Sequence, residues 1–211
     1  MSINAKNEGG GNSTPVAAGT YAARCYSMIE LGTIKGTYMG EDIESHKVQI
    51  TWELPTEKKV FKEDKGEQPF SISKEFTLSM HEKANLRKML EGWRGKGFTD
   101  EEAKCFDITK LLGKPCMLSI IHKTSAQGKQ YAVISSIATV PKGMTVPEQI
   151  NKTFELSFLD FNKDNFESLP DWLKDKIKGS KEYRRTFNPE HHEVNQEQPQ
   201  SNDEPMDEMP F

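Results

Sequence analysis

The sequence predicts a mainly β domain with five strands, one helical segment, an extra C-terminal helix and an acidic tail that stays disordered. In three segments apolar and polar residues alternate with the period of two that is typical of strands, the period then becomes helical, and a nearly continuous apolar strand and a second strand follow. From Phe187 onward no apolar period remains, and Gln, Asn, Pro and acidic residues dominate. Such a composition cannot bury enough apolar surface to offset the entropy of ordering the chain.

The first three predicted strands span residues 20–31, 46–54 and 71–79, and the second has the cleanest alternation. Glycines mark a turn-rich connection between the first two strands, residues 32–45. The charged segment 56–69 predicts a projecting loop or hairpin arm before the third strand. The side chains expected to face the core are Tyr21, Cys25, Ile29, Leu31, Val48, Ile50, Trp52, Leu54, Ile72, Phe76 and Leu78.

A helical segment follows the third strand. Ser79 and Glu82 have the spacing of a capping box, and the apolar residues after them predict a helix that ends at Gly95. Thr99 and Glu102 repeat this spacing and predict a second, shorter helix. The apolar stripe of the first helix consists of Leu86, Met89, Leu90 and Trp93.

Residues 116–122 and 130–140 predict two more strands, joined as a hairpin by a polar turn. Three strands, a helical segment and two further strands form the connectivity of an OB-fold, a small Greek-key barrel in which the helical insert covers one end. An unrelated five-stranded α+β sheet is the alternative, because periodicity identifies strands but not their pairing.

An extension follows the predicted barrel. Residues 153–161 predict a strand or an extended cover, and beyond Ser168 a helical face carries Leu169, Trp172, Leu173 and Ile177. This apolar stripe needs a surface that buries it, so we expect the helix, Trp172 included, to pack on the body or in a homodimer contact. The predicted organisation is a flexible N-terminal segment 1–18, an OB-fold core 19–141, an extension 142–186 and a disordered acidic tail 187–211.

Charge divides the chain into two parts. The formal net charge is −4, but residues 187–211 contain seven acidic residues and neither Lys nor Arg. The rest of the chain therefore carries 28 basic against 25 acidic residues, a net charge of +3. A basic body with an acidic tail indicates that the tail and a polyanionic ligand compete for one surface. A tail that only aids solubility is the alternative that charge leaves open.

No catalytic, cofactor or metal site is predicted, and we expect the protein not to be an enzyme. The five histidines have no partners at ligand spacing, and no glycine-rich loop has the pattern of a phosphate site. Cys25, Cys105 and Cys116 are expected to be buried thiols in a reducing compartment. Since the sequence shows no signal peptide and no long apolar run, we expect a soluble, cytoplasmic protein without membrane contact.

Lysines and aromatic residues coincide in the segments that flank the ligand face of an OB-fold. Nonspecific binding of single strands needs positive charge along the phosphates and exposed rings on which bases stack. The candidates lie on the polar faces of the first two strands, in the glycine-rich connection, in the charged arm and around the last hairpin. They are Arg24, Tyr26, Tyr38, Lys47, Gln49, Thr51, Lys58, Lys59, Phe61, Lys62, Lys123, Lys129 and Tyr131.

The last nine residues, DEPMDEMPF, form a candidate docking tip. They combine acidic side chains with an aromatic ring beside a free carboxylate, which a basic-rimmed apolar pocket of a partner protein can capture. The residues expected to dock are Asp203, Glu204, Asp207, Glu208, Met209, Pro210 and Phe211.

These features together resemble single-stranded DNA-binding proteins, and the phage-encoded ones more than the bacterial housekeeping protein. The bacterial protein ends in an acidic tip that closes with Pro and Phe, matched here by Pro210 and Phe211. Residues 52–55, 113–118 and 168–183 are also similar to phage proteins of this type. The tip departs from the bacterial pattern at Pro205, Met206 and Met209, and the helical insert and residues 145–185 exceed the minimal barrel.

The resemblance implies a protein that coats single-stranded DNA with little sequence preference during phage replication, repair or recombination, in the cytoplasm of the bacterial host. Its tip would recruit replication or recombination enzymes and, without DNA, lie against the basic groove. Two alternatives remain at this stage: an annealing protein that pairs complementary strands, and a structural interaction module that does not bind nucleic acid.

Overall fold

A computed structural model of the chain describes residues 15–61 and 63–187. The strands are β1 Gly19–Tyr38, β2 Glu41–Val60, β3 Glu67–Thr77, β4 Pro115–Thr124, β5 Gln130–Ala138 and β6 Phe154–Leu156. The α-helices are α1 Asn85–Arg94, α2 Asp100–Lys104, α3 Lys163–Glu167, α4 Asp171–Lys178 and α5 Lys181–Phe187. Two short 3₁₀ helices are η1 Glu63–Lys65 and η2 Ile108–Leu111.

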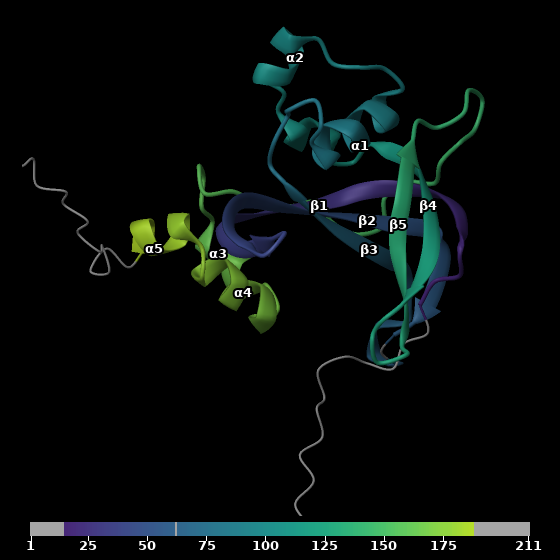
Figure 1. The fold of residues 1–211 in the computed structure, drawn as a ribbon. Helices are drawn as coiled ribbons and strands as arrows, with labels where there is room; N and C mark the ends of the chain where they lie inside the picture. The colour runs from purple at the N-terminus through teal and green to yellow at the C-terminus, as the bar shows by residue number, and fades with distance from the viewer. Residues whose placement is uncertain (1–14, 62, 188–211) are drawn as a thin grey trace, which may run out of the picture.

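The six strands form one sheet in the order β3-β2-β1-β4-β5, and its neighbours along this path are antiparallel. The short β6 lies off this path and pairs with β1 in parallel. Among the described residues no backbone ladder joins β3 to β5, so the sheet is open there. The prediction of a mainly β protein with helices between the third and fourth strands is confirmed (Figure 1).

The first two strands are longer than predicted. β1 and β2 continue through the glycine-rich connection to a tight turn at Met39 and Gly40, whose φ angles are 53° and 87°. Two successive positive φ angles are the geometry of a two-residue hairpin turn. Gly32, with a φ of 78°, lies where the register of β1 shifts. A glycine there makes a bulge in the strand and does not end it.

A main core lies between the sheet and α1. Val48, Ile50, Trp52 and Leu54 of β2 are all buried, as the alternation predicted. The ring centroids of Trp52 and Trp93 are 5.9 Å apart, which joins the sheet to the helix. Two residues that were expected in the core are less buried than predicted: Tyr21 is half-buried, and Leu78 is 40% exposed.

The helical insert begins and ends where local sequence directs it, with one exception. Gly95 closes α1 with a φ of 69°, and Thr99 with Glu102 forms the predicted capping box of α2. The predicted cap at Ser79 is wrong, because α1 begins at Asn85 and its N-cap is Ala84, which makes no side-chain cap hydrogen bond. The expectation of three buried thiols also needs correction: Cys25 and Cys116 are buried, but Cys105 is exposed.

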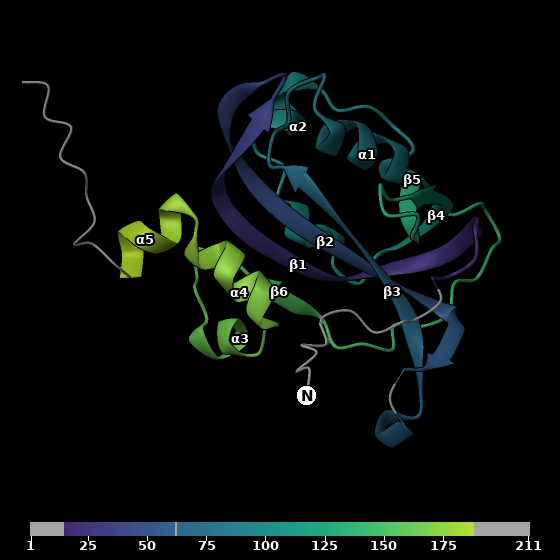
Figure 2. The ribbon, with the colours of Figure 1, turned by 60° about the horizontal axis from the view of Figure 1, so that its bottom comes forward.

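A second core lies on the opposite face of β1. Ile29 and Leu31 of β1 pack with Leu156 of β6, with Phe166 of α3, with Leu173 and Ile177 of α4, and with Leu169 between these helices. Figure 2 shows α1 and α2 on one side of the long β1–β2 ribbon and α3, α4 and α5 on the other. The predicted helical stripe therefore packs on the body. Trp172 is the exception, since it is 59% exposed.

Polar contacts fasten the extension to the sheet. The fully buried carboxylate of Glu53 on β2 accepts hydrogen bonds from the backbone N–H of Ile150 at 2.6 Å, and from the backbone N–H and side-chain amide of Asn151 at 2.8 and 2.6 Å. Since a charged acceptor with three donors is stronger than a neutral one, this contact holds residues 150–151 against the sheet.

We expect Glu53→Ala to lower the free energy of unfolding by at least about 2 kcal/mol, because it leaves partly buried donors without an acceptor. Urea denaturation measures this loss. The control Glu67→Ala, at an exposed position of β3, is expected to change stability by less than about 0.5 kcal/mol. Equal stability of the two variants would contradict the anchoring role of Glu53.

Candidate nucleic-acid interface

A groove runs along the free edge of β3, facing β5. Three hollows of about 560, 340 and 490 Å³ follow one another along this edge. The first lies between Phe61, the β3 segment Gln68–Ser73 and Ala132 of β5. The second and third share Lys74, Phe76 and Asn85, so they are continuous. We call the three hollows together the β3 groove.

Lys74 lies at the middle of the groove. Its Nζ donates a hydrogen bond of 3.0 Å to the carbonyl oxygen of Ile134, which links β3 to β5 across the open side of the sheet. Burial lowers the pKa of Lys74, and the positive charge of Lys123 lowers it further. A cation that is partly desolvated and repelled by a second cation is stabilised by an incoming anion.

Other lysines surround it. Lys88 lines the second hollow, and Lys47 and Lys83 line the third. Among the described residues that line the three hollows, Glu75 is the one carboxylate, and it is already paired with Lys176 of α4. The groove is therefore basic. Its uncharged polar side chains are Gln68, Ser71, Ser73, Thr77, Ser79, Asn85, Ser135, Ser136 and Asn151.

Aromatic rings gather at the other end of the groove. Phe61 is 44% exposed, and its ring makes an edge contact with Phe70 at a centroid distance of 5.1 Å. The hydroxyl of Tyr26 lies 3.4 Å from the Oγ of Ser71, which lines the first hollow. Tyr131, also 44% exposed, precedes the hollow-lining Ala132 on β5. Exposed rings beside a basic groove can stack on bases.

Several predicted residues lie at or beside this groove. Lys47 and Phe61 line it, and Lys123 is close enough to Lys74 to influence its pKa. Lys58 and Lys59 pair in register with Pro69 and Gln68, which line the first hollow. Tyr131 pairs with Lys123, and the exposed Lys129 follows the turn between β4 and β5.

Other predicted residues have structural surroundings. Gln49 and Thr51 are buried at 7% and 6% exposure, and the hydroxyl of Thr51 lies 2.9 Å from that of Ser73. The sequence predicted a free polar face here, but the extension covers the face of β1 and β2 on which they lie. Gln49 and Thr51 are therefore not part of the candidate interface.

Arg24 is also occupied. Its Nε, Nη1 and Nη2 donate to the carbonyl oxygens of Pro147, Gly113 and Val146 at 2.6, 2.9 and 3.2 Å. The guanidinium thus ties the start of the extension to the segment before β4, where its donors are not free to hold a phosphate.

Tyr38 is the last residue of β1, next to the β1–β2 turn, where its register partner is Glu41 and the following residue of β2 is Asp42. These two carboxylates would repel phosphate. Lys62 and the docking tip lie outside the described residues; the tip consists of Asp203, Glu204, Asp207, Glu208, Met209, Pro210 and Phe211.

Sequence reasoning missed most of the lysines of the groove. Lys74 shares the phase of the core residues Ile72 and Phe76, so its period assigned it to the interior. Lys83 is an ordinary polar position before α1, and Lys88 is one within it. No local signal distinguishes them, because they meet only when α1 packs against β3 and β5.

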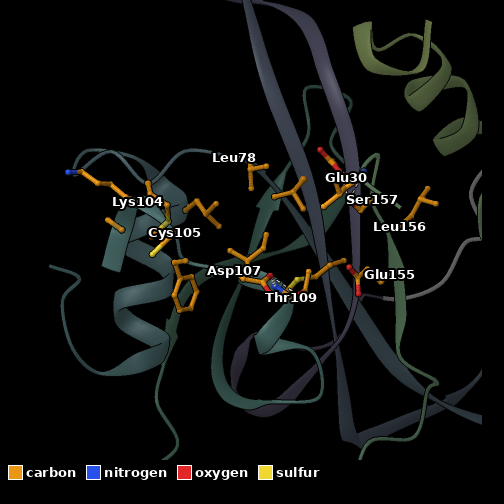
Figure 3. A pocket seen from close by; sticks show the side chains of 17 residues that line it. Glu30, Leu78, Lys104, Cys105, Asp107, Thr109, Glu155, Leu156 and Ser157 are labelled. Atoms are coloured by element: carbon orange, nitrogen blue, oxygen red, sulfur yellow. Dashed lines mark hydrogen bonds between the residues drawn. The ribbon is translucent and has the colours of Figure 1, made fainter. Parts of the chain in front are cut away.

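A further hollow of about 400 Å³ lies between the α2–η2 segment and β6 (Figure 3). Its floor is apolar, with Leu78, Phe106 and Leu156 among its lining. Glu30 at its edge accepts hydrogen bonds from Ser157 and Phe158, and hydrogen bonds from Thr109 lower the pKa of Asp107. The lining carries three carboxylates, Glu30, Asp107 and Glu155, against one lysine, Lys104, so the charge of this hollow is not suited to phosphate.

Within residues 15–61 and 63–187 there is no group of three or more His, Cys, Asp or Glu side chains arranged to hold a metal ion. No helix in these ranges is both long enough and apolar enough to cross a bilayer. The chain matches no protein-family model, no curated protein and no solved structure. Its function is therefore argued from the groove itself.

We expect Arg24→Ala to lower the free energy of unfolding by about 2 kcal/mol, because three backbone carbonyls lose a charged donor. Any affinity of the folded protein for single-stranded DNA should stay within about twofold of wild type. Urea denaturation and fluorescence anisotropy measure the two effects, with the exposed Arg185→Ala as control. A large loss of affinity with unchanged stability would instead show that Arg24 belongs to the interface.

Proposed function

We propose that the protein binds and coats single-stranded DNA without strong sequence preference, and that the β3 groove is the path of the strand. The observation that carries this proposal is the charge of the groove: four lysines, Lys47, Lys74, Lys83 and Lys88, line it with one carboxylate, which is already paired. Closely spaced lysines beside polar side chains are suited to the phosphates of a flexible strand.

We further propose that the body is an OB-fold. The strand order β3-β2-β1-β4-β5 is that of a five-stranded Greek-key barrel opened between its end strands. Residues of β3 and β5 that line the same hollows rise together in number, from Ile72 and Ala132 to Phe76 and Ile137. The two strands therefore run side by side in the same direction. The bond from Lys74 to Ile134 supports closure at this point.

The aromatic end of the groove favours single strands over duplex DNA. Phe61 and Phe70 line the first hollow, and the hydroxyl of Tyr26 reaches Ser71 of its lining. A base can stack on a ring only after leaving the double helix. Such stacking contributes ~1–3 kcal/mol per base and tolerates every base. Lysines and rings together therefore predict affinity with little sequence preference.

The rest of the proposal comes from the resemblance of the C-terminal tip. In this view the protein has no catalytic activity, acts where phage replication, repair or recombination exposes single strands, and recruits enzymes through the tip ending in Phe211. The tip and DNA compete for the basic groove, because both are polyanions.

The proposal predicts salt-dependent binding of oligo-dT that weakens when the groove loses charge. For Lys83→Ala/Lys88→Ala we expect roughly 10- to 30-fold weaker binding at 0.1 M salt. The slope of log K against log salt should fall by about 1.4, since each phosphate contact of a single strand contributes about 0.7. Fluorescence anisotropy of a labelled oligonucleotide at several salt concentrations measures both quantities.

Lys163→Ala is the matched control, since Lys163 is exposed on α3 in the extension. Its affinity and slope should equal those of wild type. If wild type fails to bind oligo-dT even at low salt, the protein is a structural module and the proposal is wrong. Rapid pairing of complementary strands would identify an annealing protein instead.

A further inference from the structure

Trp172 is the one tryptophan of this chain that the fold does not bury. It is 59% exposed, whereas Trp52 and Trp93 are 0% and 5% exposed. Its helix, α4, is anchored without it, because Leu173 and Ile177 of the same helix enter the second core. A large aromatic side chain that packing does not require is a candidate for binding.

The flank of α4 that carries Trp172 faces β3. Lys176 lies four residues later, on the same side of the helix, and its Nζ pairs with Glu75 of β3. The other flank faces α3, where Lys174 pairs with Glu167 and the Nζ of Lys178 lies 6.0 Å from the ring of Phe166. Trp172 therefore lies on the flank of α4 that Lys176 joins to β3, away from α3.

Contacts of α4 and α5 indicate the course of the chain over the sheet. Lys176 meets Glu75, which pairs with Gln49, while Lys181 meets Glu44 farther toward the β1–β2 turn. The chain thus advances along β2 from Gln49 toward Glu44, on the side of the ribbon away from α1 (Figure 2). Trp172 precedes Lys176 by one helical turn, about 6 Å, which corresponds to about two residues of a strand.

Two residues before Glu75 on β3 is Ser73. It is exposed, pairs with Thr51 and lines the first hollow. From the Lys176–Glu75 pair we infer that Trp172 lies on the outer side of the sheet near this part of β3, outside the lining of the three hollows. Lys47, on β2, lines the lysine end from the same outer side. A strand that follows the groove passes the indole.

We propose that Trp172 is a base-stacking residue that the C-terminal extension adds to the DNA path. This inference rests on the proposed function and makes it specific: the extension is part of the binding surface and not only a cover of β1. Stacking of one base on the indole contributes a factor of roughly 5 to 150 in affinity.

The test is titration of the full chain with unlabelled oligo-dT, followed by tryptophan emission, together with anisotropy of labelled oligo-dT. We expect DNA to quench the emission of wild type, and Trp172→Phe to abolish the quenching while affinity stays within about threefold. Trp172→Ala should bind at least about fivefold more weakly. Phe187→Ala, which removes another exposed aromatic side chain of the extension, should bind like wild type.

Each outcome decides a different point. Salt-dependent binding by wild type, with equal affinity of Trp172→Ala and no quenching from Trp172, would overturn the stacking role and leave the proposed function standing. Failure of wild type to bind would overturn both. A dimer that Trp172→Ala converts to a monomer in sedimentation would assign the residue to a subunit contact. Since Trp172→Phe keeps an aromatic ring, it tests the role even if Trp172→Ala does not fold.

Discussion

The whole structure depends on β1, which is the shared partner of three strands and is buried on both faces. β2 and β4 pair along its two edges, and β6 pairs with its middle. Side chains of a strand alternate between the two faces of its sheet, and two register shifts change which residues face which side, so Cys25 and Met28 face α1 while Ile29 and Leu31 face the extension. β1 is thus the common wall of two cores.

Polar anchors hold the second layer on this wall. Glu53 and Arg24 fasten the segment that crosses from β5 to β6, and Glu182 of α5 accepts hydrogen bonds of 2.6 Å from the backbone and hydroxyl of Thr33. Burial opposes ionisation of Glu182, but the hydrogen bonds from Thr33 and the nearby His46 hold its pKa below the usual range. The extension is therefore joined to the sheet by charge as well as by apolar packing.

This layer decides where a ligand can bind. By covering Gln49 and Thr51 it removes the polar face of β2, and it leaves the free edge of β3 as the basic surface. An open strand edge can also pair with the edge of another protein, and lysines discourage such pairing. The same lysines line the proposed DNA path, so one set of side chains can serve both purposes.

Much of the fold could be predicted from local sequence, because alternation, caps and turns act within a few residues. The strand of Val48, Ile50, Trp52 and Leu54 and the capping box of Thr99 and Glu102 are examples. The length of β1 could not, since Gly32 serves equally in a turn and in a bulge until β2 pairs with it.

The candidate site divides in the same way. The sequence by itself determined the basic body, the acidic tail and the presence of lysines and rings, because charge and residue type do not depend on packing. Only the tertiary structure decided that Lys74, Lys83 and Lys88 meet in one groove and that Arg24 is occupied by backbone carbonyls. The tertiary structure also decided that Trp172 is exposed, because Leu173 and Ile177 of the same helix enter the second core and Trp172 does not.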